Sequence, residues 1–587
     1  MAASDLKSPS MKAVSKTLRR FNADHAPFTS LAELTQAIKS HRHLDPLSTI
    51  DLSLSQLLPF KALKGIEAAV TLLVTALQQQ QRIVIIGDFD TDGATSTAVA
   101  VSALKALGAK HVHYLVPNRF KYGYGLTPQI VHAALVFKPD LLITVDNGIA
   151  SIDGVHAANA AGLQVLVTDH HLAGHQLPAA AAIVNPNQPG DHFASKHLAG
   201  VGVIFYVMLA LRSQLRTTGW FTHQQLTEPN LAELLDFVAL GTVADVVPLD
   251  HNNRILVYQG LQRIRAGKCH PGITALIALG KKKPQQLQAT DLGFIVAPRL
   301  NAAGRLEDMS LGIHCLLTDN LSDAQTLAMQ LDALNKERRA IEATMQLEAY
   351  HALEQLTLNP KAVTLGICLY QAHWHQGVTG IIAARLKDRY AIPTIAFAKV
   401  DNGDLKGSGR SVAGLNIRDL LDNIATKNPG LIDHFGGHAM AAGLNLAAEN
   451  YDPFSAAFHA ELALCFNPNQ IASMLWSDGE LATPLLQLST ATAIAELGPY
   501  GSAFTEPLFD GVFQLLEQRL VGSKHLKCSF QALDSDVILN GIAFNIDVND
   551  WPNYQAHKVQ LAYRLDINDF QNRHSLQLMI ESIHVIQ

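Results

Sequence analysis

Three aspartates stand at alternate positions directly after one of the most apolar segments of the chain. Residues 83–93 read IVIIGDFDTDG, so Asp88, Asp90 and Asp92 follow four apolar residues and precede Gly93. Three carboxylates this close cannot all ionise cheaply without a counter-charge. The stretch therefore predicts a metal cation bound at the end of a buried strand.

One familiar metal site has the same opening pattern and can be excluded. D-x-D-x-D-G also begins the calcium loop of an EF-hand, which needs a Glu at its twelfth position and a helix in front. Counted from Asp88, the twelfth position is Val99, and the preceding residues 83–86 are β-rich. The EF-hand interpretation fails on both counts, so the carboxylates indicate another kind of metal site.

Three further predicted strand ends carry ligand-type side chains. LLITVDNG carries Asp146, VLVTDHH carries Asp169, His170 and His171, and FVALGTVADVVPL carries Asp245. In open α/β sheets, ligands bind outside the carboxyl ends of the strands. We expect these groups to converge there with the first three aspartates.

The residue types indicate which metal such a site would take. In an extended stretch, residues two apart face the same way about 7 Å apart, so the first three aspartates are expected to line one rim. Carboxylates and imidazole without a thiolate suit Mn²⁺ or Mg²⁺ better than Zn²⁺. The predicted metal ligands are Asp88, Asp90, Asp92, Asp146, His170 and Asp245.

Each of these residues also has an ordinary structural interpretation. A single Asp after a strand is more often a helix N-cap or a turn former than a ligand, and an isolated His-His pair is more often solvated or satisfied in the core. Their joint occurrence favours the metal, because ligand types stand at four predicted strand ends of one parallel sheet and none of these ends carries Lys or Arg.

Strands and helices that alternate along the chain must position these residues. The expected helices are 64–80, 94–107, 127–137 and 151–161, and the expected strands are 82–87, 111–117, 141–145 and 165–168. This alternation predicts an α/β domain with a parallel sheet and helices on both faces. Apolar helices are expected to follow at about 200–214 and 230–241.

The rest of the chain divides into further regions. Residues 321–356 have helical periodicity without Pro or Gly, which favours one connecting helix, and the α/β alternation resumes after it. Five β-like runs after about residue 470 are consistent with an OB-type barrel. The expected domains are an N-terminal extension 1–50, a catalytic domain 51–320, the helix 321–356, a second α/β domain 357–466 and the barrel 467–587.

Composition and charge set limits on partners and location. Five scattered cysteines without a CxxC pair fit a reducing cytosol. The N-terminal residues have no apolar h-region, and no run approaches the ~20 apolar residues of a spanning helix. The net charge of −6 means that any nucleic-acid site must be a local groove.

The four motifs GDFDTDG, VDNG, TDHH and ADVVPL resemble those of the DHH phosphoesterase superfamily, most closely the RecJ-type single-stranded-DNA-specific exonucleases. The resemblance runs from about residue 50 to the end. Family II pyrophosphatases and nano-RNases have a His four residues before the first metal Asp. Here that position is Ile86 and Asp88 lies between, as in RecJ-type enzymes.

The resemblance implies a fold and an activity. The fold is a parallel-sheet DHH domain, joined by a long helix to a smaller α/β DHH-associated domain and followed by an OB-type β-barrel. The activity is 5′→3′ hydrolysis of single-stranded DNA in repair and recombination, using two Mn²⁺ or Mg²⁺ ions that activate water. His171 is expected to contact the scissile phosphate, and Asp169 to orient the histidines. The implied partner is single-strand-binding protein, and the implied state is a cytoplasmic monomer.

Glycine-rich and cationic segments of the second half offer phosphate contacts. FIVAPRLNAAGR, GSGRS and FGGHAMAAG are each weak alone, but together they resemble the DHH-associated domain, which holds substrate phosphate. We assign FIVAPRLNAAGR functionally to the second lobe, by which we mean the phosphate-binding DHH-associated domain. Arg119, in PNRFKYGYGL, is a further candidate, with a solvated loop arginine as the alternative. The predicted substrate-binding residues are Arg119, Asn301, Arg305, Ser408, Arg410 and His438.

Two other functions remain open at this point. One is a small-substrate phosphoesterase acting on short oligonucleotides or pyrophosphate, which would not need the β-barrel. The other is a scaffold without catalysis, against which the complete ligand set argues. The barrel is expected to guide long strands through cations near Lys524, His525 and Lys527. Its aromatic residues either stack on bases or fill the core: Phe513, Phe530, Phe544 and Tyr563.

Overall fold

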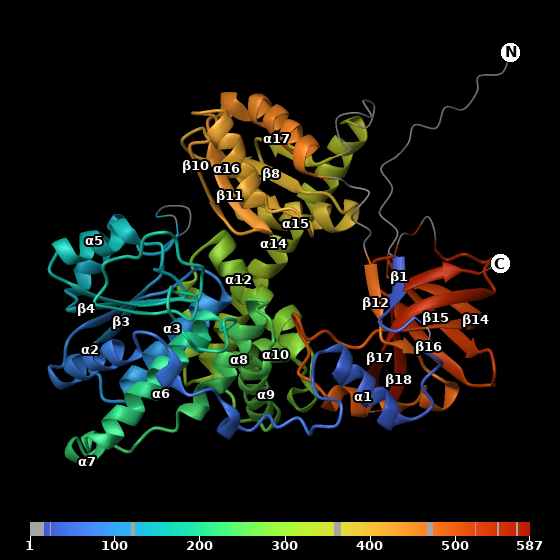
Figure 1. Ribbon diagram of the computed structural model, residues 1–587, viewed down its shortest axis with the longest axis horizontal. Helices are drawn as coiled ribbons and strands as arrows, with labels where there is room; N and C mark the ends of the chain where they lie inside the picture. Colours follow the sequence, from blue (N-terminus) through green and yellow to red (C-terminus); the bar gives the residue numbers. More distant parts are fainter. Residues whose placement is uncertain are drawn as a thin grey trace. The chain divides into compact units, whose positions relative to one another are not determined.

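The computed structural model describes residues 17–23, 25–118, 122, 124–356, 365–466, 474–522, 524–546, 548, 551–570 and 573–586. These residues divide into two compact units, and Figure 1 labels their helices and strands. The smaller unit holds the described parts of Met1–Ala23 and Lys336–Ser477, and the larger unit those of Asp24–Asn335 and Asp478–Gln587. Among the described residues, no helix is both long and apolar enough to cross a membrane.

A five-stranded parallel sheet with the order β3-β2-β4-β5-β6 carries the motifs of the larger unit. Its strands are β2 (Ile83–Ile86), β3 (Val112–Leu115), β4 (Leu141–Val145), β5 (Gln164–Thr168) and β6 (Ala182–Val184). The chain places β3 on one side of β2 and β4 on the other. Ligands bind at such a switch point, outside the carboxyl ends of the strands.

The alternation of side chains along β2 explains the helices on both faces of this sheet. Ile83 and Ile85 belong to one buried apolar cluster, and Val84 and Ile86 belong to another. The first cluster includes residues of α2 (Ile66–Gln78), α3 (Thr91–Ala106), α6 (Gly200–Thr217) and α8 (Leu235–Ala244), and the second includes residues of α4 (Pro128–Ala134) and α5 (Ile152–Ala160). The expected α/β layering is confirmed.

Two expectations about the metal-binding segments are wrong. Helix α3 begins at Thr91 rather than at 94, so Asp90 is its N-cap and Asp92 lies in its first turn instead of an extended rim. Asp245 follows helix α8 as its C-cap and not a strand. Carboxylates at a helix start are stabilised by the exposed backbone N–H groups there, which favours the earlier start of α3.

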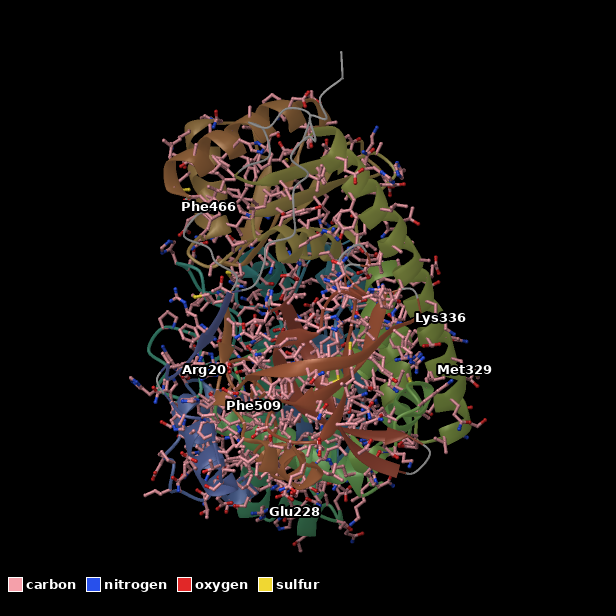
Figure 2. The ribbon with its side chains drawn as sticks, turned by 90° about the vertical axis from the view of Figure 1, so that its right-hand side faces the viewer. Arg20, Glu228, Met329, Lys336, Phe466 and Phe509 are labelled. Atoms are coloured by element: carbon pink, nitrogen blue, oxygen red, sulfur yellow. The ribbon has the colours of Figure 1, made fainter. Side chains whose placement is uncertain are left out.

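Further helices complete this part of the larger unit: α7 (Trp220–His223), α9 (His251–Arg265), α10 (Pro271–Leu279), α11 (Ala289–Asp291), α12 (Ala297–Leu306) and α13 (Ser310–Leu317). The long helix α14 (Leu321–Leu356) has 36 residues and spans the stretch expected to be one helix. The boundary between the two units falls within α14, between Asn335 and Lys336. Figure 2 labels Met329 before this boundary and Lys336 after it.

A closed β-barrel forms the C-terminal part of the larger unit. Five strands form the ring in the order β14-β15-β16-β18-β17, which the pairing of β14 with β17 closes, and the short strand β13 pairs with β14 beside it. They are β13 (Gly479–Glu480), β14 (Phe509–Val521), β15 (His525–Ala532), β16 (Ile538–Ala543), β17 (Lys558–Phe570) and β18 (Arg573–Val585), with helix α18 (Leu488–Glu496) before them. The OB-type barrel is confirmed.

The barrel aromatics mostly fill its interior. Phe513, Phe530 and Tyr563 are buried in one apolar cluster, because they lie at inward positions of β14, β15 and β17. Of the two predicted roles, filling the core is therefore the correct one for Phe513, Phe530 and Tyr563, and stacking on bases is excluded for them. Phe544 differs, since 51% of it is exposed.

Part of the N-terminal extension belongs to this barrel. Helix α1 (Leu31–His41) places Leu34 and Ile38 in the barrel's apolar cluster, together with Phe28. Two hydrogen bonds from Arg42, of 2.8 and 3.1 Å, reach the buried carboxylate of Asp478. These contacts complete the core of the barrel with residues far away in sequence.

The smaller unit contains a five-stranded mixed sheet with the order β10-β11-β9-β8-β7. Its strands are β7 (Ile367–Gln371), β8 (Thr394–Lys399), β9 (Leu405–Arg410), β10 (His434–Gly437) and β11 (Ala441–Leu446), and its helices are α15 (Thr379–Tyr390), α16 (Ile417–Lys427) and α17 (Tyr451–Cys465). Apart from this sheet, β1 (Thr17–Arg20) pairs in parallel with β12 (Met474–Ser477).

Candidate metal centre

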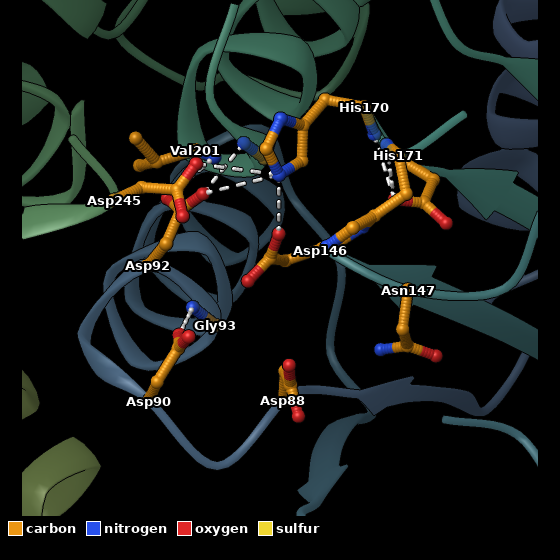
Figure 3. Close-up of polar contacts among 12 residues, drawn as sticks. Asp88, Asp90, Asp92, Gly93, Asp146, Asn147, His170, His171, Val201 and Asp245 are labelled. Atoms are coloured by element: carbon orange, nitrogen blue, oxygen red, sulfur yellow. Dashed lines mark hydrogen bonds and ion pairs between the residues drawn. The ribbon is translucent and has the colours of Figure 1, made fainter. Parts of the chain in front are cut away.

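The loop between β2 and α3 presents the first two carboxylates. Asp88 is buried and accepts a hydrogen bond from the backbone N–H of Phe89 at 2.7 Å, while Asp90 accepts one from Gly93 at 3.0 Å (Figure 3). A Cβ on Gly93 would lie 2.6 Å from the backbone of Asp88. Only glycine therefore allows the helix to start this close to the metal-binding loop.

Asp92 is held by the start of another helix. Its two carboxylate oxygens accept hydrogen bonds from the backbone N–H groups of Gly200 at 2.7 Å and Val201 at 3.0 Å. These residues begin α6, where unpaired N–H groups and the helix dipole favour an anion. A Cβ on Gly200 would come within 2.6 Å of the Asp146 side chain, so glycine here lets α6 approach both carboxylates.

Asp146 adopts a backbone conformation that is uncommon outside glycine. Its φ is +62°, in the left-handed region, and its N–H donates to the carbonyl of Thr168 at 3.1 Å. Strained backbone of this kind persists where the surrounding structure dictates it, and it concentrates at functional sites. The turn directs the carboxylate to the imidazole of His170, whose Nε2 lies 3.2 Å from Oδ1 of Asp146.

His170 brings together side chains from three other segments. Its Nε2 lies 3.2 Å from Asp146, 3.5 Å from Asp245 and 4.0 Å from Asp92. The backbone carbonyl of His170 accepts a hydrogen bond from the side chain of Asn187 at 2.6 Å, which fixes the loop. One imidazole nitrogen thus faces three carboxylates, as Figure 3 shows.

Three sets of ligand atoms are close enough to hold cations. In each set the atoms lie within 4.8 Å of one another. The sets are Asp88, Asp90 and Asp146; Asp92, His170 and Asp245; and Asp146, His170 and His171. Asp146 and His170 each belong to two sets, so they connect neighbouring positions. All six predicted metal ligands are brought together, although from helix ends as well as strand ends.

The electrostatics of the cluster fit divalent cations. Burial and the charge of Asp90 raise the pKa of Asp92 to about 7. Burial and the charge of Asp92 likewise raise the pKa values of Asp146 and Asp245 well above the usual range. The raised pKa values show that these carboxylates need positive charge to stay ionised together. Oxygen-rich sites with one imidazole and no thiolate suit Mn²⁺ or Mg²⁺.

Asp169 and His171 form a second, tightly hydrogen-bonded pair. The Nδ1 of His171 lies 2.7 Å from Oδ1 of Asp169, while Oδ2 accepts from the N–H of Ile149 at 2.9 Å. Burial alone would raise the pKa of Asp169, but the bond and charge of His171 outweigh it and the pKa falls. Burial alone would lower the pKa of His171, but Asp169 raises it to about 9. The carboxylate thus fixes the orientation of the imidazole.

Tyr124 joins this site without having been singled out in the sequence. Its hydroxyl lies 3.3 Å from the carbonyl oxygen of Asp146 and 3.4 Å from Nε2 of His171. Its ring contacts Phe89 edge to face, with the centroids 5.9 Å apart. The stretch PNRFKYGYGL was noted only for Arg119, which lies outside the described residues. No local pattern distinguishes Tyr124 from other loop tyrosines.

The segment FIVAPRLNAAGR lies in the larger unit, so its assignment to the second lobe is wrong. The amide oxygen of Asn301 accepts hydrogen bonds from the N–H and hydroxyl of Thr91, at 2.8 and 2.9 Å. A Cβ on Gly304 would lie 1.7 Å from the carbonyl oxygen of Phe89, so α12 supports the metal-binding loop. Arg305 is half-buried at the end of this helix.

The predicted phosphate-binding residues of the smaller unit gather at one end of α15. Ser408 and Arg410 occupy alternate positions on β9, and the hydroxyls of Ser408 and Thr379 lie 3.0 Å apart. A Cβ on Gly380 would lie 2.9 Å from the Arg410 guanidinium. The N–H of His438 donates to Ala441, the residue paired with Arg410. A helix start, an arginine and hydroxyls suit an anion.

Three family models match the chain. They are the DHH family N-terminal domain over residues 82–242, the DHHA1 domain over 359–464 and the RecJ OB domain over 477–582. The matches follow the order of the metal-binding domain, the smaller unit's sheet and the barrel.

Named relatives are similar over nearly the whole chain. The single-stranded-DNA-specific exonuclease RecJ of Dickeya dadantii is 52% identical, over 98% of this chain and 100% of that protein. The RecJ of Escherichia coli is 49% identical, over 94% of this chain and 96% of that protein. The crystal structure of Thermus thermophilus RecJ in complex with Mn²⁺ is 29% identical with a TM-score of 0.77, covering 97% of this chain and 80% of that one.

Proposed function

The chain belongs to the RecJ family of single-stranded-DNA-specific exonucleases, and we propose how its own residues carry out that reaction. It hydrolyses phosphodiester bonds of single-stranded DNA with Mn²⁺ or Mg²⁺, in the 5′→3′ direction, in repair and recombination. The observation that carries this proposal is the convergence of three ligand sets at the β2–β4 switch point.

The metal ligands are proposed to hold two cations, which, when bound, lower the pKa of water and stabilise the attacking and leaving oxygens. Asp146 connects two of the ligand sets, and Asp92 is anchored to the start of α6. The proposed ligands are Asp88, Asp90, Asp92, Asp146, His170 and Asp245. The chain's contribution is to hold these carboxylates close together in a buried site, where they need the positive charge of the cations to stay ionised together.

His171 is proposed to contact the scissile phosphate. The hydrogen bond between its Nδ1 and Asp169 stabilises the imidazolium, and we propose Nε2 as the donor toward substrate. Asp169 acts through His171 as a positioning residue. Its Oδ1 also accepts a hydrogen bond of 2.7 Å from the backbone N–H of His170. Tyr124 lies next to Nε2 of His171 and bounds the space for the phosphate.

The smaller unit is proposed to bind the 5′ end or the adjacent backbone. Arg410 supplies a planar pair of donors suited to phosphate, and the start of α15 supplies backbone N–H groups. Ser408 and His438 are proposed to add further contacts from β9 and the β10–β11 turn. Asn301 and Arg305 are proposed to act from the larger unit, on the helix behind the metal-binding loop. We place the domain boundaries at 51–320, 357–466 and 467–587.

The barrel distinguishes this function from a small-substrate phosphoesterase. An enzyme that acts on pyrophosphate or short oligonucleotides does not need a domain that guides a long strand. The barrel that could guide one is complete in this chain. Outward residues of β14 and β15 border a cavity of about 570 Å³ that includes Arg519 and Lys527. We propose that this cavity guides long strands. Single-strand-binding protein as a partner, a monomeric state and a cytoplasmic location are proposed on the basis of family membership.

Digestion of end-labelled DNA tests the proposed function. A 5′-phosphorylated single strand is incubated with the protein and Mn²⁺ or Mg²⁺, against duplex DNA and RNA of the same sequence. Release of mononucleotides from the 5′ end of the single strand alone is expected. Release from the 3′ end would overturn the polarity, and equal digestion of duplex or RNA would overturn the substrate class.

A further inference from the structure

The N-terminal strand and the segment before the barrel form a two-stranded parallel ribbon within the smaller unit. Strand β1 (Thr17–Arg20) aligns with β12 (Met474–Ser477), so that Arg19 pairs with Trp476. The N–H of Phe21 extends the pairing by donating to the carbonyl of Ser477 at 3.0 Å. The ribbon thus joins residues more than 450 positions apart, and Figure 2 labels Arg20 at the end of β1.

The two faces of this ribbon differ in exposure, because side chains alternate along each strand. One face is half-buried to buried and carries Leu18, Arg20, Leu475 and Ser477. The opposite face, called here the ribbon face, is exposed throughout and carries Thr17, Arg19, Phe21, Met474 and Trp476.

The ribbon face is unusually apolar and aromatic for an exposed surface. Phe21 is 45% exposed, Trp476 44% and Met474 41%. The rings of Phe21 and Trp476 are stacked, with centroids 5.4 Å apart and planes 25° apart. Clustered apolar side chains that stay exposed on a folded surface mark an interaction site. Within the ribbon face the only formal charge is that of Arg19, and it is positive.

We propose that the ribbon face binds single-stranded DNA by stacking bases on Phe21 and Trp476, while Arg19 contacts the backbone. The inference rests on the proposed function, since it assigns a further contact for the same substrate. Aromatic platforms beside a cation hold single strands without sequence preference, because every base has a π-face. The positive charge of Arg19 on this face favours a polyanion over a basic or a purely apolar partner.

The net charge of the chain makes such local contacts important. At −6, the protein as a whole does not attract a polyanion. A strand must therefore be held by discrete sites with aromatic and cationic side chains. The ribbon face is one of these sites, and it is built by the N-terminal extension together with the segment preceding the barrel.

Tryptophan fluorescence tests this inference directly. Trp476 is exposed, whereas Trp220, Trp374 and Trp551 are at most 9% exposed. Oligodeoxythymidylate is added to the metal-free protein in EDTA, so that no hydrolysis occurs. We expect quenching of the emission as the bases stack, and we expect Trp476→Phe to remove this change while it keeps the affinity measured by anisotropy of a labelled oligonucleotide.

Affinity measurements separate stacking from an indirect effect. Phe21→Ala and Trp476→Ala are expected to weaken binding of a long oligonucleotide about five-fold or more, since stacking contributes about 1–3 kcal/mol per base. Phe294→Ala is the control, because Phe294 is a 78% exposed aromatic residue of the larger unit. It is expected to bind as wild type. Circular dichroism and an unchanged melting midpoint confirm that each variant is folded.

The outcomes distinguish this inference from the proposed function. Unchanged emission together with wild-type affinity of both alanine variants would overturn the ribbon inference, even if hydrolysis with Mn²⁺ is normal. A response of Trp476 to an acidic peptide but not to the oligonucleotide would also overturn it, in favour of a protein partner. Absence of hydrolysis with Mn²⁺, despite quenching and weakened variants, would overturn the proposed function and leave the binding site standing.

Discussion

The guanidinium of Arg254 stacks on the ring of Phe504, and its central carbon Cζ lies 3.7 Å from the ring centroid. Arg254 lies on α9 of the metal-binding domain, and Phe504 precedes the first long barrel strand. The same guanidinium donates to the carbonyl of Leu497 at 2.7 Å. Burial lowers the pKa of Arg254 to about 10. This contact fastens the barrel to the metal-binding domain within one unit.

Truncation of Arg254 is expected to loosen that attachment. Arg254→Ala removes the hydrogen bond and the cation–π contact and leaves a cavity, for a loss of about 2 kcal/mol or more. Arg254→Met is the matched variant, because it fills the space without a buried charge and should lose less. Urea denaturation of the metal-free proteins measures the difference. Equal stability of Arg254→Ala and wild type would contradict this role.

Removal of a metal ligand is expected to abolish hydrolysis but not folding. Asp90→Asn keeps the hydrogen bond to Gly93, and His170→Ala removes a side chain shared by two ligand sets. Rates in saturating Mn²⁺ should fall below about a tenth of wild type. Asp90→Asn also reduces carboxylate repulsion, so the metal-free melting midpoint should stay or rise.

A matched carboxylate outside the cluster is the control for these ligand variants. Asp153 is exposed in the first turn of α5. Asp153→Asn should therefore hydrolyse DNA at the wild-type rate. Mn²⁺ should raise its melting midpoint as much as it raises that of the wild type. Loss of that metal-induced stabilisation in His170→Ala, with retention in Asp153→Asn, is the expected pattern. Mn²⁺ that stabilises all variants equally would argue against the proposed ligands.

The Asp478 ion pair is expected to make stability depend on pH on the acid side. Burial alone would raise the pKa of Asp478, but hydrogen bonds from His41 and Arg42 lower it below the usual range. A depressed pKa in the folded state stabilises the protein above the unfolded value of about 4. That stabilisation is lost as pH falls through the folded pKa.

Comparison of Asp478→Asn with wild type measures this contribution. At pH 7 the variant should be less stable by about 2 kcal/mol, and the gap should narrow as the pH is lowered below about 4. Urea midpoints from pH 7 to pH 3 give the two curves. Parallel curves over this range would show that the ionisation of Asp478 does not contribute.

Arg410 is expected to recognise a terminal phosphate. Arg410→Ala should weaken binding of a 5′-phosphorylated strand about ten-fold, because hydrogen bonds to charged groups contribute about 1.5–3 kcal/mol. Binding of the 5′-hydroxyl strand should change less. Arg418→Ala, an exposed arginine of the same unit, serves as the control. Equal losses on both strands would replace end recognition with a general backbone contact.

The barrel cavity is expected to hold long strands electrostatically. Arg519 and Lys527 are paired in register across β14 and β15 and both border the cavity. Each alanine variant should lower affinity for long strands and reduce the slope of log K against log salt by about 0.7. Removing the whole barrel is a poorer test, since Leu34 and Ile38 would lose their core. Lys524→Ala is the control variant, because Lys524 does not border this cavity. An equal loss of affinity in Lys524→Ala would refute a groove localised at Arg519 and Lys527.

The sequence determined the chemistry of this protein and most of its elements. The ligand types, the parallel α/β order, the helix Leu321–Leu356 and the five long barrel strands all follow from local patterns. Periodicity of 2 or 3.6 residues and apolar runs are local properties, so they identify elements without knowledge of what packs on them. The resemblance of four short motifs was enough to identify the family.

Only the tertiary structure decided how the ligands are presented. Asp90 and Asp92 belong to a helix start because Gly93 lets α3 begin against the loop, and Asp92 is held by α6, over 100 residues away. Asp245 comes from a helix end, and Tyr124 reaches the site from a loop. These contacts depend on packing between segments that are distant in the chain, and no local pattern records such neighbours.

The same reason explains the surfaces. Apolar residues in and next to the barrel strands look alike in sequence, so only closure of the barrel buried Tyr563 on β17 and left Phe544, just after β16, exposed. The extension before residue 50 has no sequence feature that points to a partner. Its helix α1 enters the barrel core and its strand β1 pairs with β12, because burial and strand pairing join segments regardless of their separation in the chain.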